Sequence, residues 1–160
     1  MTVRAFNVQG FEADAGMKGL LPGAQFADAF RVAVDDDTLT ARQAAERMFL
    51  RLPRWISGLM KLRNLVVAPL GLKTPTHTKT IVADSVGPFP VISATPQRLV
   101  AGFDDKHLDF RVIVDVTGDI PGRQVTATTL VLTHNLPGRV YLATIMPFHR
   151  IIVPAMLRQI

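Results

Sequence analysis

The chain contains no cysteine, and only one tryptophan and one tyrosine occur among its 160 residues. The lack of cysteine excludes disulfides, thiolate metal sites and cysteine nucleophiles. The four histidines follow neither HxH nor HxxxH spacing, so no metal site is expected. There is also no GxSxG turn and no GxGxxG motif. The sequence therefore offers no signal for a serine hydrolase or a dinucleotide-binding half, and no cofactor is expected.

Long apolar runs are also scarce. The first 30 residues include Arg4, Glu12, Asp14 and Lys18, which argues against a signal peptide. No stretch approaches the ~20 apolar residues expected of a membrane span. Hydrophobic residues make up 48% of the chain and charged residues 19%, a globular composition. We expect a single cytoplasmic domain over residues 1–160, with an irregular segment at 1–20.

The excess positive charge lies in one segment. The formal net charge is +5, and residues 38–64 hold six basic residues against one acid, Glu46, which accounts for all of it. A basic helical surface can meet a membrane, an acidic protein or phosphate, or it can be a solvated outer face. Nucleic-acid binding is not expected, because exposed aromatics do not alternate with the basic residues. The six basic residues are Arg42, Arg47, Arg51, Arg54, Lys61 and Arg63.

Residues 25–34 alternate in the size and polarity of their side chains, which predicts a β-strand. Phe26, Asp28 and Phe30 share one face of this strand. Three consecutive aspartates at 35–37 end it, since aspartate disfavours strands and favours turns.

Two short helices are predicted next. Thr40 and Gln43 have the spacing of a capping box and predict a helix over 40–52, while Pro53 separates it from a second helix over 54–66. Apolar residues recur along the second helix at helical spacing and are expected to be buried. These residues are Trp55, Ile56, Leu59, Leu62 and Val66.

The second half of the chain is predicted to be a meander of strands closed by one helix. A loop over 69–88, with a short strand at 80–83, comes first. Turns of hairpin length link the strands, so the strands must be antiparallel. Pro147 is expected to begin the final helix and Pro154 to kink it near Arg150. The predicted strands cover residues 89–95, 98–103, 107–116, 123–135 and 139–146.

This order of elements resembles the START-like helix-grip superfamily, also called SRPBCC or Bet v 1-like. Residues 21–28, 87–90 and 147–150 (LPGAQFAD, GPFP and PFHR) further resemble an uncharacterised bacterial family, domain of unknown function 2867. The resemblance implies an α+β fold in which a curved antiparallel sheet wraps a C-terminal helix around a cavity. It brings no catalytic residues. Such domains also occur fused behind a dehydrogenase-like domain, which makes such a domain an expected partner.

Asp28 is the most unusual polar residue, because it shares the apolar face of its strand. A carboxylate there needs a partner, and it could anchor a ligand, act as a base or be purely structural. His149 could donate a hydrogen bond within the cavity, or bond only to backbone. His134 and Tyr141 are expected to face each other across a turn at 136–138, near the cavity mouth or as a hairpin cover.

The favoured function is binding of a small apolar or amphipathic ligand between the sheet and the last helix. One alternative is a cyclase- or hydratase-type enzyme using Asp28 or His149. Another is an interaction module that presents Arg47, Arg51, Arg54 and Lys61 to an acidic protein or membrane. An open edge strand offers a route to a homodimer. The residues expected to line the cavity are Asp28, Phe30, Trp55, Leu59, Phe110, Tyr141, Phe148, His149 and Ile152.

Overall fold

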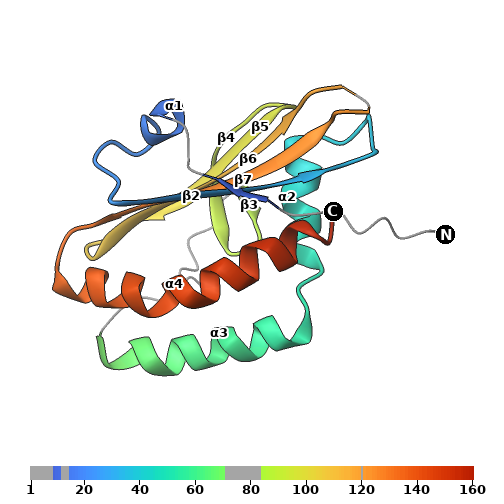
Figure 1. Cartoon of the computed structure of the whole chain (residues 1–160). Helices are drawn as coiled ribbons and strands as arrows, with labels where there is room; N and C mark the ends of the chain where they lie inside the picture. The colour runs from blue at the N-terminus through green and yellow to red at the C-terminus, as the bar shows by residue number, and fades with distance from the viewer. Residues whose placement is uncertain (1–8, 12–14, 71–83, 120) are drawn as a thin grey trace.

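The computed structural model describes residues 9–11, 15–70, 84–119 and 121–160. It is an α+β fold in which a curved, seven-stranded antiparallel sheet is crossed on one face by a C-terminal helix (Figure 1). The strands are β1 (Gln9–Phe11), β2 (Phe26–Ala33), β3 (Ser85–Val86), β4 (Phe89–Ala94), β5 (Arg98–Asp104), β6 (Leu108–Thr117) and β7 (Gln124–Thr133). The helices are α1 (Ala15–Lys18), α2 (Ala41–Leu50), α3 (Arg54–Val67), the 3-10 turn η1 (Ala68–Leu70) and α4 (Leu136–Leu157).

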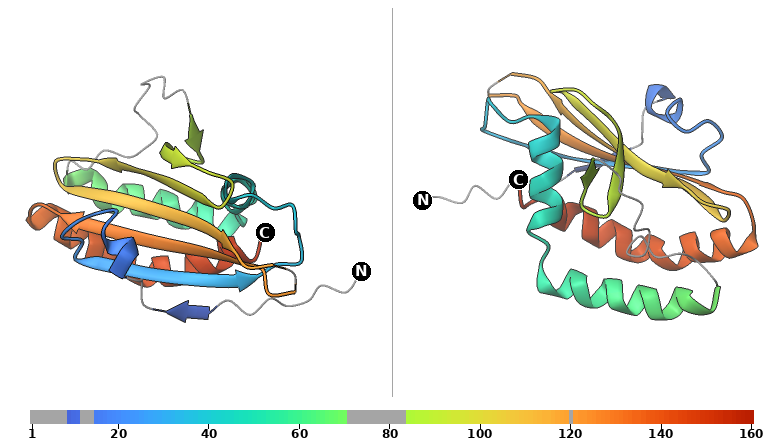
Figure 2. Two further views of the ribbon diagram at one scale, coloured as in Figure 1. Left: turned by 90° about the horizontal axis from the view of Figure 1, so that it is seen from above. Right: turned by 180° about the vertical axis from the view of Figure 1, so that it is seen from behind.

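The strand order is β1-β2-β7-β6-β5-β4-β3, so the first long strand pairs with the last one. Helices α3 and α4 lie on one side of this sheet and α1 lies on the other (Figure 2). The register between β4 and β5 shifts between Val91 and Ser93, an irregularity that bends a sheet. Gly102 on β5 has a φ of 155°, and a Cβ there would lie 2.0 Å from the carbonyl oxygen of Phe110. Only glycine lets the two strands approach this closely.

The two sides of the sheet carry separate apolar clusters. The larger cluster lies between the concave face and the helices, and its fully buried members include Leu99 of β5 and Leu157 of α4. The smaller one lies under α1, where Leu21 and Met17 cover Ile113 and Leu130. Alternation along the strands therefore supplies both faces with apolar side chains.

The predictions for the first strand and the capping box are confirmed. β2 covers residues 26–33, and Thr40 caps α2 by accepting from the Gln43 N–H while the Gln43 side chain accepts from the Thr40 N–H. Pro53 is the N-cap of α3, as expected of a proline at a helix start. The side chain of α2 residue Arg42 donates to both carboxylate oxygens of Asp84, next to β3. That hydrogen-bonded guanidinium lowers the pKa of Asp84.

The predicted strand at 139–146 and the turn at 136–138 are wrong, because both segments belong to the 22-residue helix α4. Asn135 caps this helix by accepting a hydrogen bond from the Gly138 N–H at 3.1 Å. Pro137 occupies its first turn, where the missing N–H costs nothing. Pro147 and Pro154 both lie inside the helix, so Pro147 does not begin it.

Three further predictions need correction or lie outside the description. The segment expected to be irregular contains β1 and α1. Strand β3, at 85–86, falls within the predicted loop, whereas the strand predicted at 80–83 lies outside the described residues. Helix α4 is also long and apolar enough to cross a bilayer, contrary to the expectation from the sequence. Its residues Val153, Met156 and Leu157 nevertheless pack into the larger apolar cluster.

Candidate functional site

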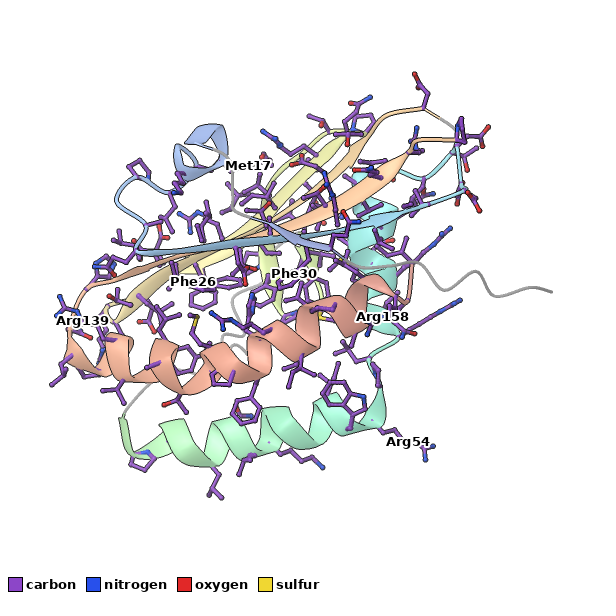
Figure 3. All side chains as sticks on the ribbon, in the orientation of Figure 1. Met17, Phe26, Phe30, Arg54, Arg139 and Arg158 are labelled. Atoms are coloured by element: carbon purple, nitrogen blue, oxygen red, sulfur yellow. The ribbon has the colours of Figure 1, made fainter. Side chains whose placement is uncertain are left out.

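The structure brings Asp28 of β2 and His149 of α4 into direct contact. The His149 Nε2 atom lies 3.1 Å from each carboxylate oxygen of Asp28. Both side chains are mostly buried, with 17% of His149 and 19% of Asp28 exposed, so solvent still reaches them. Phe26 meets the imidazole edge-on, with ring centroids 5.7 Å apart. Figure 3 shows Phe26 and Phe30 between β2 and α4, on the face that also holds Asp28.

Asp28 determines which nitrogen of His149 is free. A carboxylate can only accept, so in the neutral imidazole Nε2 carries the proton and donates it to Asp28. The other nitrogen, Nδ1, is then an acceptor, and it makes no hydrogen bond to any residue in the described part of the chain. A hydroxyl or another proton donor could therefore bind at Nδ1. The same nitrogen could accept a proton, as in the base of an Asp-His pair.

An apolar wall continues from this pair across the concave face. In register, Phe26 is followed by Val131 on β7, Phe110 on β6 and Phe103 on β5. Phe110 stacks against Phe103 and Phe89, with ring centroids 5.7 and 5.0 Å apart. All three stacked rings are only half-buried. Phe110 is the ring nearest to the Asp28 strand, because β6 lies two strand spacings, about 10 Å, from β2.

The row next to this wall contains small or polar residues. Asp28 is aligned with Thr129 on β7, then with Val112 on β6 and Ala101 on β5. Thr129 is 4% exposed and stands beside the carboxylate-bearing position. Its hydroxyl gives this row a second polar group. The concave face therefore combines one polar end with one aromatic end.

The other residues proposed to line the cavity are divided between core and surface. Phe30 and Ile152 pack against the larger apolar cluster. Trp55 and Phe148 are 45% and 37% exposed, so the expected burial of Trp55 is wrong, as is that of Leu62 at 49%. Tyr141 is a half-buried residue of α4, and the side chain of Leu59 lies outside the described part. Within this set, Asp28 and His149 form a direct polar contact with each other.

His134 and Tyr141 do not form the predicted hairpin pair, because Tyr141 belongs to α4. The His134 Nε2 atom instead lies 3.0 Å from the Asp109 carboxylate. Asp109 is aligned with Leu132 on the convex face of the sheet, away from α4. This second His–Asp pair thus stands outside the concave face.

Phe26, Phe89, Phe103 and Thr129 were not among the residues predicted to line the site. Phe26 could have been included, because the alternation of the strand already placed it on the Asp28 face. The other three are brought to the site by strand pairing between distant segments, which leaves no local signal. No group of three or more potential metal-ligating side chains occurs within the described ranges.

Two cavities lie at the end of the sheet where β2 ends and β7 begins, and neither is lined by Asp28 or His149. One has a volume of about 210 Å³ and is lined in part by Leu39, Arg47 and Ile160. The other, of about 540 Å³, is an open groove lined in part by Gln97 and Arg123. These hollows are separate from the concave-face site.

Comparison with known proteins identifies the family. No curated protein and no solved structure matches the chain. The family model described as "Protein of unknown function (DUF2867)" matches residues 20–156, which include β2, both members of the Asp28–His149 pair and most of α4. The chain belongs to this family of proteins of unknown function, DUF2867.

Proposed function

We propose that this protein is a START-like helix-grip domain that binds a small amphipathic molecule along its concave face. The observation that carries the proposal is the Asp28–His149 contact. A polar pair stands between an apolar strand face and an apolar helix, and His149 Nδ1 has no hydrogen-bond partner among the described residues. Binding sites typically combine apolar walls with a few polar groups that fix orientation.

The ligand that fits this face has one hydrogen-bond donor and a flat apolar body. Its donor would meet His149 Nδ1, whose acceptor state Asp28 maintains. Its apolar body would lie toward Phe110 and Phe103, where aromatic rings favour stacking. The span of about 10 Å between the two ends corresponds to a two-ring molecule.

A pair of probes tests this arrangement: 1-naphthol, which carries a hydroxyl donor, and 1-methylnaphthalene, which has the same shape without it. We expect the wild-type protein to bind 1-naphthol about 10-fold more tightly, since one hydrogen bond contributes about 1–1.5 kcal/mol. In His149→Phe the two probes should bind equally. Calorimetric or fluorescence titration of each probe measures the ratio.

The second His–Asp pair supplies a matched control. His134→Phe removes an imidazole that also contacts an aspartate, at 3.0 Å, but on the convex face. This variant should keep the preference for 1-naphthol. Equal affinities for both probes in the wild type would contradict the proposal. Native mass spectrometry of protein purified from cells, repeated after denaturing extraction, then identifies the natural ligand.

A second function, proton transfer of the kind used by cyclases and hydratases, is favoured by the same pair. The unbonded Nδ1 can take a proton from a carbon next to a carbonyl, and the imidazolium formed is stabilised by the Asp28 carboxylate. The imidazolium then returns a proton to the same carbon, so the ketone is regenerated and no other reactant is needed. In heavy water the imidazolium exchanges its proton for a deuteron of the solvent before it re-protonates the carbon, so each such cycle replaces hydrogen with deuterium.

The ketone 2-tetralone tests this activity, because it is amphipathic, has two fused rings and carries acidic C–H bonds beside its carbonyl. The wild-type protein should accelerate its deuterium exchange roughly 100-fold or more over buffer, as followed by proton NMR. His149→Phe should remove the acceleration, whereas His134→Phe should retain it. Exchange no faster than in buffer would leave the protein as a binding domain for such ketones.

A further inference from the structure

Exposed apolar side chains are concentrated on the helices, above all on α3 and α4, which lie below the sheet in Figure 1. Ten large hydrophobic residues are exposed in the described part of the chain, and eight of them belong to α2, α3 or α4. Two, Leu20 and Ile92, lie elsewhere. The eight are Leu50, Trp55, Leu62, Leu65, Leu136, Val140, Phe148 and Ile151. Such clustering on one layer marks an interaction surface, whereas single exposed hydrophobics do not.

On α3 the exposed apolar residues form a continuous stripe. Trp55, Gly58, Leu62 and Leu65 follow one another at intervals of three, four and three residues, the spacing of one helix face. Trp55 is 45% exposed, Leu62 49% and Leu65 73%, and a Cβ built at Gly58 meets no atom within 4 Å. The opposite side of the helix holds Ile56, which is 1% exposed. About half or more of each of these apolar side chains is therefore open to solvent, on the side of α3 opposite Ile56.

A parallel stripe runs along α4. Leu136, Val140 and Ile151 are 70%, 44% and 58% exposed, and the intervening positions Ala143 and Pro147 on the same face are exposed as well. The opposite face of α4 packs on the sheet. With α3 beside it (Figure 2), α4 completes a two-helix surface that we call the helical face.

The helical face is positively charged. Neither α3 nor α4 contains aspartate or glutamate, while together they contain Arg54, Lys61, Arg63, Arg139 and Arg150. Figure 3 shows Arg54 at one end of α3 and Arg139 at the start of α4, at opposite ends of this surface. Arg54 and Lys61 are exposed beside the apolar stripe of α3. By contrast, Arg42 and Arg47 of α2 are engaged by Asp84 and Asp36.

We propose that the helical face binds the surface of an anionic lipid bilayer, with Trp55, Leu62 and Leu65 at the level of the headgroups. Helices that lie in a membrane interface combine Trp and Leu on one face with flanking Lys and Arg. Each basic residue near an anionic leaflet adds to the attraction. A second copy of the chain is disfavoured as the occupant, because its helical face carries the same uncompensated positive charge.

Trp55 reports directly on this binding, because it is the only tryptophan of the chain. The probe is a vesicle of phosphatidylcholine with 30% phosphatidylserine, compared with pure phosphatidylcholine, at 50 mM and 500 mM salt. We expect co-flotation with the anionic vesicles at low salt and a blue shift of Trp55 emission. Both should be lost at high salt or without phosphatidylserine, because screening removes the electrostatic attraction.

Two matched pairs of variants locate the surface. Lys61→Glu should weaken vesicle binding about fivefold or more, while Lys18→Glu makes the same change of charge on α1, across the sheet, and should have little effect. Leu65→Ser should likewise weaken binding several-fold. Leu20→Ser, next to α1, is its control. All four positions are exposed, so each variant is expected to fold.

Three results would overturn the proposal. One is absence of binding to the anionic vesicles at 50 mM salt. Another is flotation without a shift of Trp55 emission, since it would place the lipid contact elsewhere. The third is a concentration-dependent dimer that shifts Trp55 emission without lipid, because it would assign the surface to a second copy of the chain.

Discussion

Gly138→Ala is expected to lower the free energy of unfolding by about 2–3 kcal/mol, equivalent to a fall of roughly 5–10 °C in the melting temperature. A Cβ at this position would lie 2.2 Å from the carbonyl oxygen of His107 and 3.0 Å from its carbonyl carbon. Both atoms belong to the backbone, so no side-chain rotation can relieve the overlap. The helix or the turn before β6 must move instead.

The same contact explains why α4 begins where it does. Asn135 accepts from the Gly138 N–H and donates to the carbonyl oxygen of Lys106, which ties the helix start to the β5–β6 turn. His107 is 9% exposed and its Nδ1 lies 3.2 Å from the Asn135 side chain. Displacing the first turn of α4 therefore disturbs several hydrogen bonds at once.

Gly58→Ala provides the matched control, because Gly58 is also a helical glycine but its Cβ would enter open space. That variant should gain about 0.5–1 kcal/mol from improved helix propensity. Calorimetric melting of the two variants beside the wild type makes the comparison. If Gly138→Ala melts no lower than the wild type, α4 does not start against His107.

Leu157→Ala is expected to cost about 2–5 kcal/mol, the usual range for removing a buried leucine side chain. Leu157 is 1% exposed and packs in the larger apolar cluster at the end of α4. Leu136 makes the ideal comparison, because it begins the same helix and is 70% exposed. Leu136→Ala should change stability by no more than about 0.5 kcal/mol. Urea unfolding of the three proteins measures both differences.

The comparison of Leu157→Ala with Leu136→Ala also tests whether the C-terminal half of α4 is packed in the core of the folded domain. Its length and composition would suit a bilayer span, and 22% of its most apolar window is buried. In the folded domain the C-terminal turns of α4 pack against the sheet and α2. Removing the Leu157 side chain should therefore lower the free energy of unfolding in aqueous solution. Equal and small effects of the two substitutions would mean that the C-terminal half of α4 is not packed in the core.

The contact of Gly138 with His107 and the packing of Leu157 in the larger apolar cluster together fix the position of His149. The first turn of α4 is attached to the β5–β6 turn, and the last turns are anchored in the larger apolar cluster. His149 lies between these anchors and meets Asp28 of β2. A pair positioned from both ends of its helix can hold a constant geometry toward a ligand, which binding and proton transfer both need.

Elements whose signals are local could be identified from the order of the amino acids alone. The alternation of residues 25–34 identified β2, because side chains on a strand point to opposite faces in turn. Thr40 and Gln43 identified the start of α2, because a capping box uses only neighbouring residues. The same alternation placed Asp28 on an apolar face and marked it as a residue in need of a partner.

Tertiary structure decided the state of residues 139–146. Val140, Tyr141, Thr144 and Ile145 are β-branched or aromatic residues and favour a strand locally. Packing of this segment on β2 and β7, together with the Asn135 cap, makes it helical. Local propensity is worth a few tenths of a kcal/mol per residue, so tertiary contacts override it.

Tertiary structure alone also decided the site. Asp28 and His149 are separated by 121 positions, and no sequence pattern relates them. Their contact follows from the pairing of β2 with β7 and from the course of α4 across that pair. The exposure of Trp55 and Leu62 could not be predicted from the sequence either. The periodic pattern of apolar residues along a helix is the same whether another element covers that face or not. Periodicity says which residues share a face, whereas only the packed chain says what that face meets.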